Sequence, residues 1–230
     1  MAERIGPPSP RAALARACAA LKVFPLHGVA VLPGTPTPFH IFEPRYKALV
    51  EEALATDRIL AVPALLTKEG AKQLHPPLHP VCGACVIEQE ERYPDGRFDL
   101  VVRGLARVRL GPELAPRRMY REFQAQILED VWPAGGPAAL AGALEPLRQL
   151  VYELAQRLPP ESGVAALAEA VAQMRDPSSI ADLVAAAAVS EPEARQRVLE
   201  ELDVARRLEL VLEEVAGVVL VLSKGKRPSA

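Results

Sequence analysis

One group of side chains with the chemistry to bind zinc lies between positions 75 and 85 of the sequence. Its members are His75, His79, Cys82 and Cys85. Two cysteines separated by two residues form a common half of a zinc site. Residues 82–87, however, have the composition of a strand, in which side chains three apart point to opposite faces, so only a turn at Gly83 would bring both thiols to one ion. We therefore favour an ordinary strand, keep the metal site as the weaker alternative, and expect no cofactor.

Covalent catalysis has little support in the sequence. Ser223 and Lys224 are adjacent, but they lie in a polar, basic segment where nothing would desolvate the lysine enough to make it a base. The phosphate-binding pattern GxxxxGK[ST] does not occur. A redox role for the cysteine pair would need a helix N-terminus to stabilise a thiolate, and none is predicted there. We expect neither peptide cleavage nor ATP hydrolysis, and no catalytic residue.

The candidate binding residues lie between positions 39 and 46. They are Phe39, His40, Phe42, Glu43, Arg45 and Tyr46. Neither His27 nor His40 has a nucleophile or carboxylate at a spacing that would make it a general base, so structural hydrogen bonding is favoured. We expect Glu43 to engage the free N–H groups of a helix start, and Arg45 to pair with an acid on a neighbouring strand. A structural junction is the favoured interpretation, and contact with an unfolded protein is the alternative.

The sequence has one concentration of basic residues, in its central part. It comprises Arg103, Arg107, Arg109, Arg117, Arg118 and Arg121. Such a stripe could contact phosphates, but the alternation of Arg107 and Arg109 with apolar residues more simply indicates a solvated sheet face. The formal net charge of −2 does not support general binding to polyanions, so nucleic acid is disfavoured as a partner.

The elements that position these residues begin with residues 23–50. Two short strands flank a turn at Pro33-Gly34, and Glu43-Pro44 then starts a helix, because proline suits the first helical turn. Further strands are predicted at 58–66, at 81–88, on both sides of Gly104, and at 123–131. The residues Tyr93-Pro94-Asp95-Gly96 predict a turn after the strand at 81–88. A glycine between two strands is typical of a sheet that bends towards a barrel, so we predict two strands kinked at Gly104.

Composition changes at residues 132–137, WPAGGP, which predict a linker. Downstream, helices are predicted at 138–158, 162–174 and 180–189, and one long helix from 191 onwards forms the rest of a bundle over 138–222. Seven-residue spacing of apolar residues in that last helix predicts a packed seam, which either serves its own bundle or forms a homodimer. The N-terminal residues 1–21 are predicted as a flexible lead or short helix, and 223–230 as a disordered tail.

Composition bounds the cellular setting. Half of the residues are hydrophobic and 24% are charged, which is ordinary for a globular protein, and no stretch reaches the roughly 20 apolar residues of a membrane span. Three cysteines do not make a secreted disulfide framework, and arginines interrupt the apolar N-terminal run, so it does not resemble a signal peptide. We therefore expect a cytoplasmic protein with no membrane partner.

Several separated sequence patterns resemble the LON substrate-binding domain family, which occurs at the N-terminus of Lon proteases, in the more distant cereblon, and as stand-alone bacterial proteins. The patterns are FPL at 24–26, VLPG at 31–34, PFHIFEPRY at 38–46 and PDGRFDLVVRGLARVRL at 94–110. They define a β domain over 22–131. A weaker resemblance continues through DPSSIADLVAAAA and RQRVLEELDVARRLELVLEE, at 176–188 and 195–214.

The resemblance implies an α+β fold, with a PUA-like antiparallel β pseudo-barrel followed by a C-terminal α-helical bundle. It implies a non-catalytic module that binds unfolded or exposed apolar segments of client proteins, as an adaptor in Lon-type proteolysis or quality control and with a full-length Lon protease as a further partner. Binding would use a cleft between the β domain and the bundle, or a strand edge. A small-molecule-binding or hydrolytic protein and an RNA-binding PUA-like domain are the alternatives.

Overall fold

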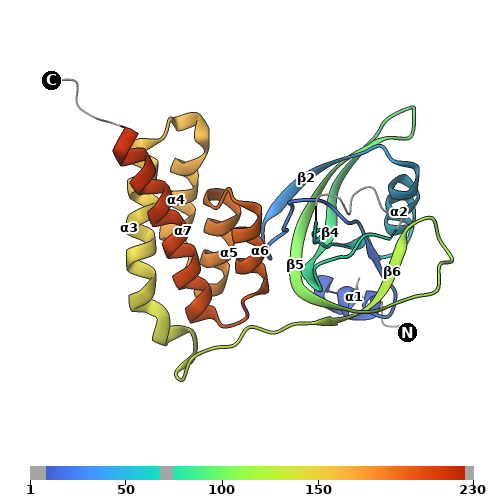
Figure 1. The fold of residues 1–230 in the computed structure, drawn as a ribbon, viewed down its shortest axis with the longest axis horizontal. Coiled ribbons are helices and arrows are strands. Elements are labelled where there is room, and N and C mark those ends of the chain that lie inside the picture. The colour runs from blue at the N-terminus through green and yellow to red at the C-terminus, as the bar shows by residue number, and fades with distance from the viewer. Residues whose placement is uncertain (1–8, 68–74, 226–230) are drawn as a thin grey trace, which may run out of the picture. The chain divides into compact units, whose positions relative to one another are not determined.

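A computed structural model describes residues 9–67 and 75–225 of the chain. The chain forms two compact units, Met1–Leu128 and Glu129–Ala230, each with its own core (Figure 1). The first unit is built around one six-stranded sheet, and the second is helical. Within the described residues, no helix combines the length and the hydropathy needed to cross a bilayer.

The sheet of the first unit closes on itself. The strand β6 pairs with both β1 and β5, so the ring runs β5-β4-β3-β1-β6 and returns to β5, while β2 lies outside it against the first half of β5. All of these pairings are antiparallel except β1 with β3, which confirms the predicted, mainly antiparallel pseudo-barrel. The strands are β1 (Leu21–Val23), β2 (Pro36–Ile41), β3 (Ile59–Val62), β4 (Val81–Arg92), β5 (Phe98–Glu113) and β6 (Arg121–Ile127).

Two glycines let a crossing segment lie directly on the sheet. Residues 29–34 pass over β4 and β5, and a Cβ at Gly83 would be 2.0 Å from the Val31 carbonyl oxygen. A Cβ at Gly104 would likewise be 2.2 Å from the Leu32 carbonyl oxygen. The prediction of two strands kinked at Gly104 is therefore wrong in one respect: β5 continues through this position as one strand, and the glycine is needed for the space that it leaves.

Helices cover the two cores of this unit. The helix α2 (Pro44–Ala55) buries the predicted apolar face, including Tyr46 and Leu49, against one core. The helix α1 (Pro10–Ala17) begins at the capping residue Ser9 and buries Leu14 completely in the other core. Residues 10–17 are thus an ordered helix and differ from a flexible lead; residues 1–8 lie outside the described part of the chain.

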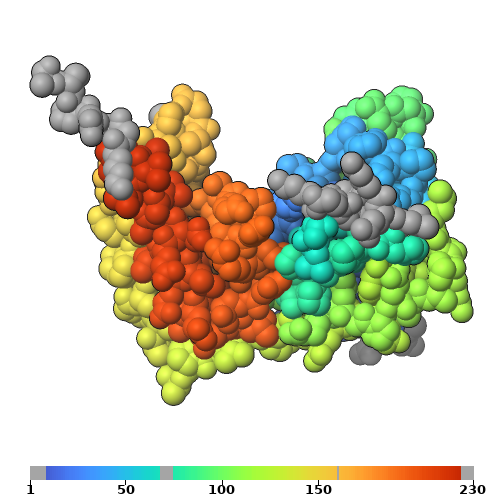
Figure 2. All heavy atoms as spheres, viewed as in Figure 1, coloured from blue at the N-terminus to red at the C-terminus, as the bar shows by residue number. Residues whose placement is uncertain are grey.

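In the second unit, α3 and α7 lie side by side and run in the same direction, so that Leu154 and Val219, near their C-terminal ends, share one core (Figures 1 and 2). The single long helix predicted from residue 191 is wrong, because the chain breaks after Glu200 and the Asp203 carboxylate accepts hydrogen bonds from the backbone N–H groups of Ala205 and Arg206. The α-helices are α3 (Ala141–Arg157), α4 (Val164–Gln173), α5 (Pro177–Ala188), α6 (Pro192–Glu200) and α7 (Val204–Gly225); the short 3-10 helices are η2 (Gly136–Leu140) and η3 (Pro160–Ser162).

Candidate functional site

The candidate binding residues divide between the two faces of β2 and the start of α2. Phe39 points inward, where its ring lies 5.4 Å from that of Phe24 in an edge-on arrangement. The ring of Tyr46 lies 4.6 Å from Phe24 on the same side. Phe39 and Tyr46 therefore help to hold β2 and α2 against the core, while His40 and Phe42 are exposed to solvent.

The contacts predicted for Glu43 and Arg45 are wrong. The Glu43 side chain makes no hydrogen bond to the start of α2, and Arg45 does not pair with an acid on a strand. Instead, Arg45 Nη2 lies 2.8 Å from Glu43 Oε2, and the guanidinium lies 4.5 Å from the centre of the Tyr46 ring. The reason is local: the Arg45 guanidinium pairs with the Glu43 carboxylate and stacks on the Tyr46 ring. The Glu43 carboxylate therefore does not cap the start of α2.

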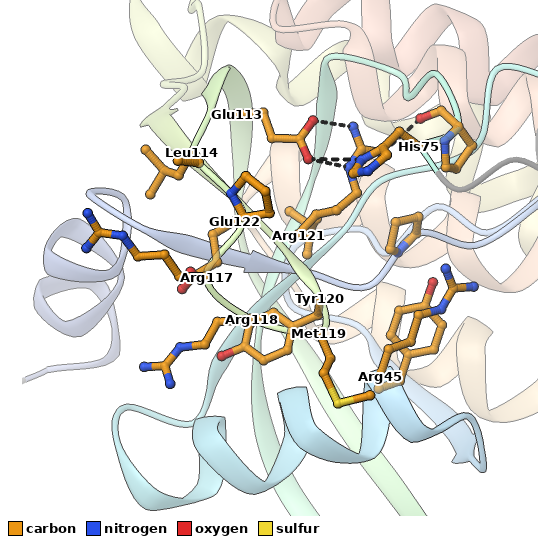
Figure 3. Close-up of a pocket in the computed structure, with 16 residues that line it drawn as sticks. Arg45, His75, Glu113, Leu114, Arg117, Arg118, Met119, Tyr120, Arg121 and Glu122 are labelled. Carbon is orange, nitrogen blue, oxygen red and sulfur yellow. Dashed lines mark hydrogen bonds and ion pairs between the residues drawn. The ribbon is translucent and has the colours of Figure 1, made fainter.

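Beside Arg45 and Tyr46 lies a cavity of about 200 Å³, which we call the Met119 cavity (Figure 3). Four segments line it: residues 23–25, the start of α2, residues 75 and 76, and residues 113–122 around the loop between β5 and β6. Figure 3 shows the Met119 side chain beside Arg45, and 67% of Met119 is exposed. The apolar part of its wall consists of Val23, Pro25, Pro76, Leu114, Ala115, Pro116 and Met119.

Ion pairs fix the rim of the Met119 cavity. Arg121 donates Nε and Nη2 to the two carboxylate oxygens of Glu113, at 2.8 and 2.7 Å, and Nη1 to the Pro76 carbonyl oxygen at 2.8 Å (Figure 3). These hydrogen bonds lower the pKa of Glu113, with a smaller contribution from His75. Since the Arg121 guanidinium joins three segments of the chain, the rim is held in place before any partner binds.

Most of the basic concentration is neutralised or buried. Arg103 pairs with Glu88 at 2.6 Å and Arg118 with Glu52 at 2.8 Å, while only 3% of Arg107 is exposed. The prediction that Arg107 belongs to a solvated face is therefore wrong, because the three successive residues 106–108 of β5 are all buried, so that both faces of the strand are covered there. Ion-paired guanidinium groups have less to gain from phosphates, so this arrangement does not favour RNA.

On the other face of β2, one exposed candidate residue, His40, belongs to a hydrogen-bonded group with Asp99 and Tyr93. His40 Nδ1 lies 2.5 Å from Asp99 Oδ1, and the Tyr93 hydroxyl donates to Asp99 Oδ2 at 2.6 Å. The hydrogen bonds from Tyr93 and then His40 lower the pKa of Asp99, while the Tyr93 pKa is raised by the same bond. Both groups are engaged by one carboxylate, which suits a fixed surface rather than proton transfer.

The free edge of β2 is poorly suited to the addition of a client strand. The Thr35 carbonyl accepts from the Gly104 N–H at 3.1 Å, so alternate residues after it face β5, and the residues between them face the free edge. Those edge residues include Pro36 and Pro38, which have no N–H, leaving His40 as the donor. Since strand addition depends on main-chain hydrogen bonds, the prolines block this mode of binding at β2.

The side chains of the weaker, zinc-binding alternative do not converge. Cys82 and Cys85 are both fully buried, but they belong to separate hydrophobic cores on opposite faces of β4. Burial raises the pKa of both thiols, which favours the uncharged form that does not bind metal. His75 faces Glu113 at 3.6 Å instead. In the described part of the chain, no three His, Cys, Asp or Glu side chains are placed to hold a metal ion.

Comparison with known proteins matches residues 20–217 to the family described as "ATP-dependent protease La (LON) substrate-binding domain". Lon proteases of Heliobacterium modesticaldum and Salinispora arenicola are 27% and 33% identical over 206 and 196 residues. These matches cover 88% and 84% of this chain but 24% and 23% of the relatives, so the chain spans about a quarter of their length.

A solved structure, the N-terminal domain of Mycobacterium avium complex Lon protease, shares the fold with a TM-score of 0.69 at 19% identity; the match covers 86% of this chain and 98% of that one. The family match runs through the β unit and most of the helical unit, in the order that the sequence patterns predict. The resemblance is thereby confirmed, and the chain belongs to the LON substrate-binding domain family.

Proposed function

We propose that this chain binds segments of client proteins that expose apolar side chains, as unfolded or partly folded proteins do, and that it performs no chemistry on them. The observation that carries the proposal is the Met119 cavity, an apolar hollow with a fixed, charged rim on the surface of the β unit. Membership of a family described as substrate-binding supports the same function.

The dimensions of the cavity suit a single anchor residue. A cavity of about 150 Å³ can hold a benzene ring, so the 200 Å³ measured here has room for one large apolar side chain. Proline rings at Pro25, Pro76 and Pro116 keep the walls stiff, whereas the Met119 side chain is unbranched and adapts to different shapes. Burial of one such anchor contributes about 1.5–3 kcal/mol, which supports weak binding of many sequences rather than tight binding of one.

The test is a titration of a fluorescently labelled, permanently unfolded polypeptide. Met119→Asp puts a charge at the mouth of the cavity and is expected to weaken binding about tenfold, in line with the loss of one anchor. Leu220→Asp is the matched control, because Leu220 is also exposed, at 54%, but lies on α7 in the helical unit. The absence of saturable binding, or an equal loss in both variants, would contradict the proposal.

We further propose that the chain acts in the cytoplasm with a full-length Lon protease, to which it delivers clients as an adaptor. The similarity to Lon proteases supports this partner, and three free cysteines fit a reducing compartment. Purified Lon protease should degrade an unfolded client faster when this chain is added, and the Met119→Asp variant should remove that increase. An unchanged rate with the wild-type chain would contradict the adaptor role while leaving client binding intact.

A further inference from the structure

A row of rings lies on the surface of the β unit, and none of its members lines the Met119 cavity. Phe42 is 61% exposed and stacks on the His40 ring, with 6.1 Å between centroids and 27° between planes. The Tyr93 ring lies 6.4 Å from His40 on the adjoining turn between β4 and β5. The Asp99 carboxylate holds His40 and Tyr93 through two hydrogen bonds, so these two rings are ordered in the absence of a partner, and Phe42 packs on the first of them. An exposed and ordered aromatic surface is typical of an interaction site.

A groove of about 570 Å³ runs beside this row and shares His40 and Asp99 with it. Its floor includes Pro38 and Val101, and the described residues that line it comprise three carboxylates and neither lysine nor arginine. The carboxylates are those of Glu90, Glu91 and Asp99. The groove is therefore apolar at its base and negatively charged along its side.

The three carboxylates differ in the partners that they already have within this chain. Glu90 forms a two-pronged ion pair with Arg58. Asp99 stays ionised, because its hydrogen bonds to Tyr93 and His40 lower its pKa. Glu91 makes no hydrogen bond or ion pair with any residue that the structure describes. Its charge nevertheless contributes to the raised pKa of Tyr93, after the larger effect of the Asp99 hydrogen bond, which places Glu91 close to the row of rings.

We propose that the ring row and the groove bind an extended segment of another protein through a lysine or arginine side chain. The aliphatic stem of such a side chain fits over Pro38 and Val101, while its cationic end meets the exposed Phe42 ring and the Glu91 carboxylate; the Tyr93 ring already carries the Arg97 guanidinium, 5.5 Å from its centroid. Charge complementarity selects this occupant: the same surface repels acidic segments and the phosphates of nucleic acid. The site is separate from the Met119 cavity and takes the opposite kind of side chain.

The experiment measures fluorescence anisotropy of three short, flexible peptides that differ only at two central positions, which are Lys, Gln or Glu. The Lys peptide is expected to bind roughly 2- to 30-fold more tightly than the Gln peptide, the range of a cation at an aromatic surface. The Glu peptide is expected to bind more weakly than both, and the Lys preference should shrink at high ionic strength. No binding of the Lys peptide, or equal binding of the Lys and Gln peptides, would overturn the proposal.

Variants locate the effect. Phe42→Leu removes the ring but keeps an apolar group, and Glu91→Gln removes the unpaired charge; each should reduce the Lys preference several-fold. Glu213→Gln on α7 changes the net charge equally at an exposed position and should leave the preference unchanged. If Glu213→Gln acts as strongly as Glu91→Gln, binding reflects overall charge and the proposed site is wrong. Met119→Asp should leave Lys-peptide binding intact, which separates this site from the proposed client cavity.

Discussion

The Arg207 guanidinium and the Asp130 carboxylate form the central ion pair of the helical unit, with Nη2 2.6 Å from Oδ1. Arg207 has no exposed surface, and its other donors reach the Ser178 hydroxyl at 2.8 Å and the Glu201 carbonyl oxygen at 2.8 Å. A second carboxylate, that of Asp182, lies 3.8 Å away. One arginine thus joins α5, α7 and the segment that enters the helical unit.

Replacing Arg207 by alanine should destabilise the helical unit by about 3–5 kcal/mol, because buried carboxylates would lose their compensating charge. Urea unfolding followed by circular dichroism measures the change. Arg206→Ala is the matched control: Arg206 is exposed and neighbours Arg207, so its loss should change stability by less than about 0.5 kcal/mol. Similar effects of the two substitutions would contradict a central role for the Arg207 network.

Gly104→Ala should destabilise the β unit by about 3 kcal/mol, since the new methyl group would meet the Leu32 carbonyl oxygen at 2.2 Å and force the crossing segment away. Thermal unfolding provides the measurement. The contrasting substitution is Gly217→Ala in α7, where the added Cβ meets nothing within 4 Å and the helix should gain about 0.5–1 kcal/mol. A neutral Gly104→Ala variant would show that the crossing segment does not rest on β5.

The ion pair between Arg121 and Glu113 should make stability depend on pH. Because Arg121 lowers the pKa of Glu113 in the folded state below its usual 4.5, the stabilisation is fully present above pH 4.5 and is lost as pH falls through the lowered value. The difference in unfolding free energy between wild type and Arg121→Gln should therefore be largest near neutral pH and shrink under acid conditions.

The control for this pH series is Arg97→Gln. Arg97 pairs with Asp95 at the surface, where both side chains are about half exposed, so its loss should have little effect at any pH. A difference for Arg121→Gln that does not change with pH would mean that only its contacts with Pro76 and Phe123 matter.

The cysteines should differ in reactivity. Cys82 and Cys85 are fully buried, and burial raises their pKa, so a thiol reagent should modify them only as the protein unfolds. Cys18 is partly exposed and should react first. Because the two buried thiols face separate cores, added zinc should leave the melting temperature unchanged. A higher melting temperature with zinc would support the metal site formed with His75 and His79.

Turns and helix starts that depend on neighbouring residues were predicted from short sequence patterns. The turn Tyr93-Pro94-Asp95-Gly96 forms as expected, with Gly96 at φ 80° and its N–H bonded to the Tyr93 carbonyl oxygen at 2.9 Å. The break between α6 and α7 was not predicted, although Asp203 is a normal capping residue, because the seven-residue apolar spacing runs straight through it. Burial of Val215 and Val219 places that spacing inside the helical unit; the homodimer through the last helix stays a prediction.

Long-range contacts explain what the sequence alone did not predict. Gly83 and Gly104 are needed because residues 29–34 cross over them, and nothing near either glycine in the sequence indicates this. The Met119 cavity is assembled from four separate segments. The sequence therefore predicted the arginine- and proline-rich loop as a loop, but could not predict that it forms a wall of this cavity. His40 and Asp99 are 59 positions apart, and only the pairing of β2 with β5 brings them together.

The strand that completes the barrel is also the last one made. Because β6 pairs with β1 near the start of the unit and with β5, the ring stays open during synthesis until Ile127 has left the ribosome. Until then β1 and β5 each have one edge whose backbone N–H and C=O groups lack their β6 partners. The barrel therefore closes only after β6 is made, and a nascent chain stalled before β6 would itself expose apolar segments of the kind proposed above as clients.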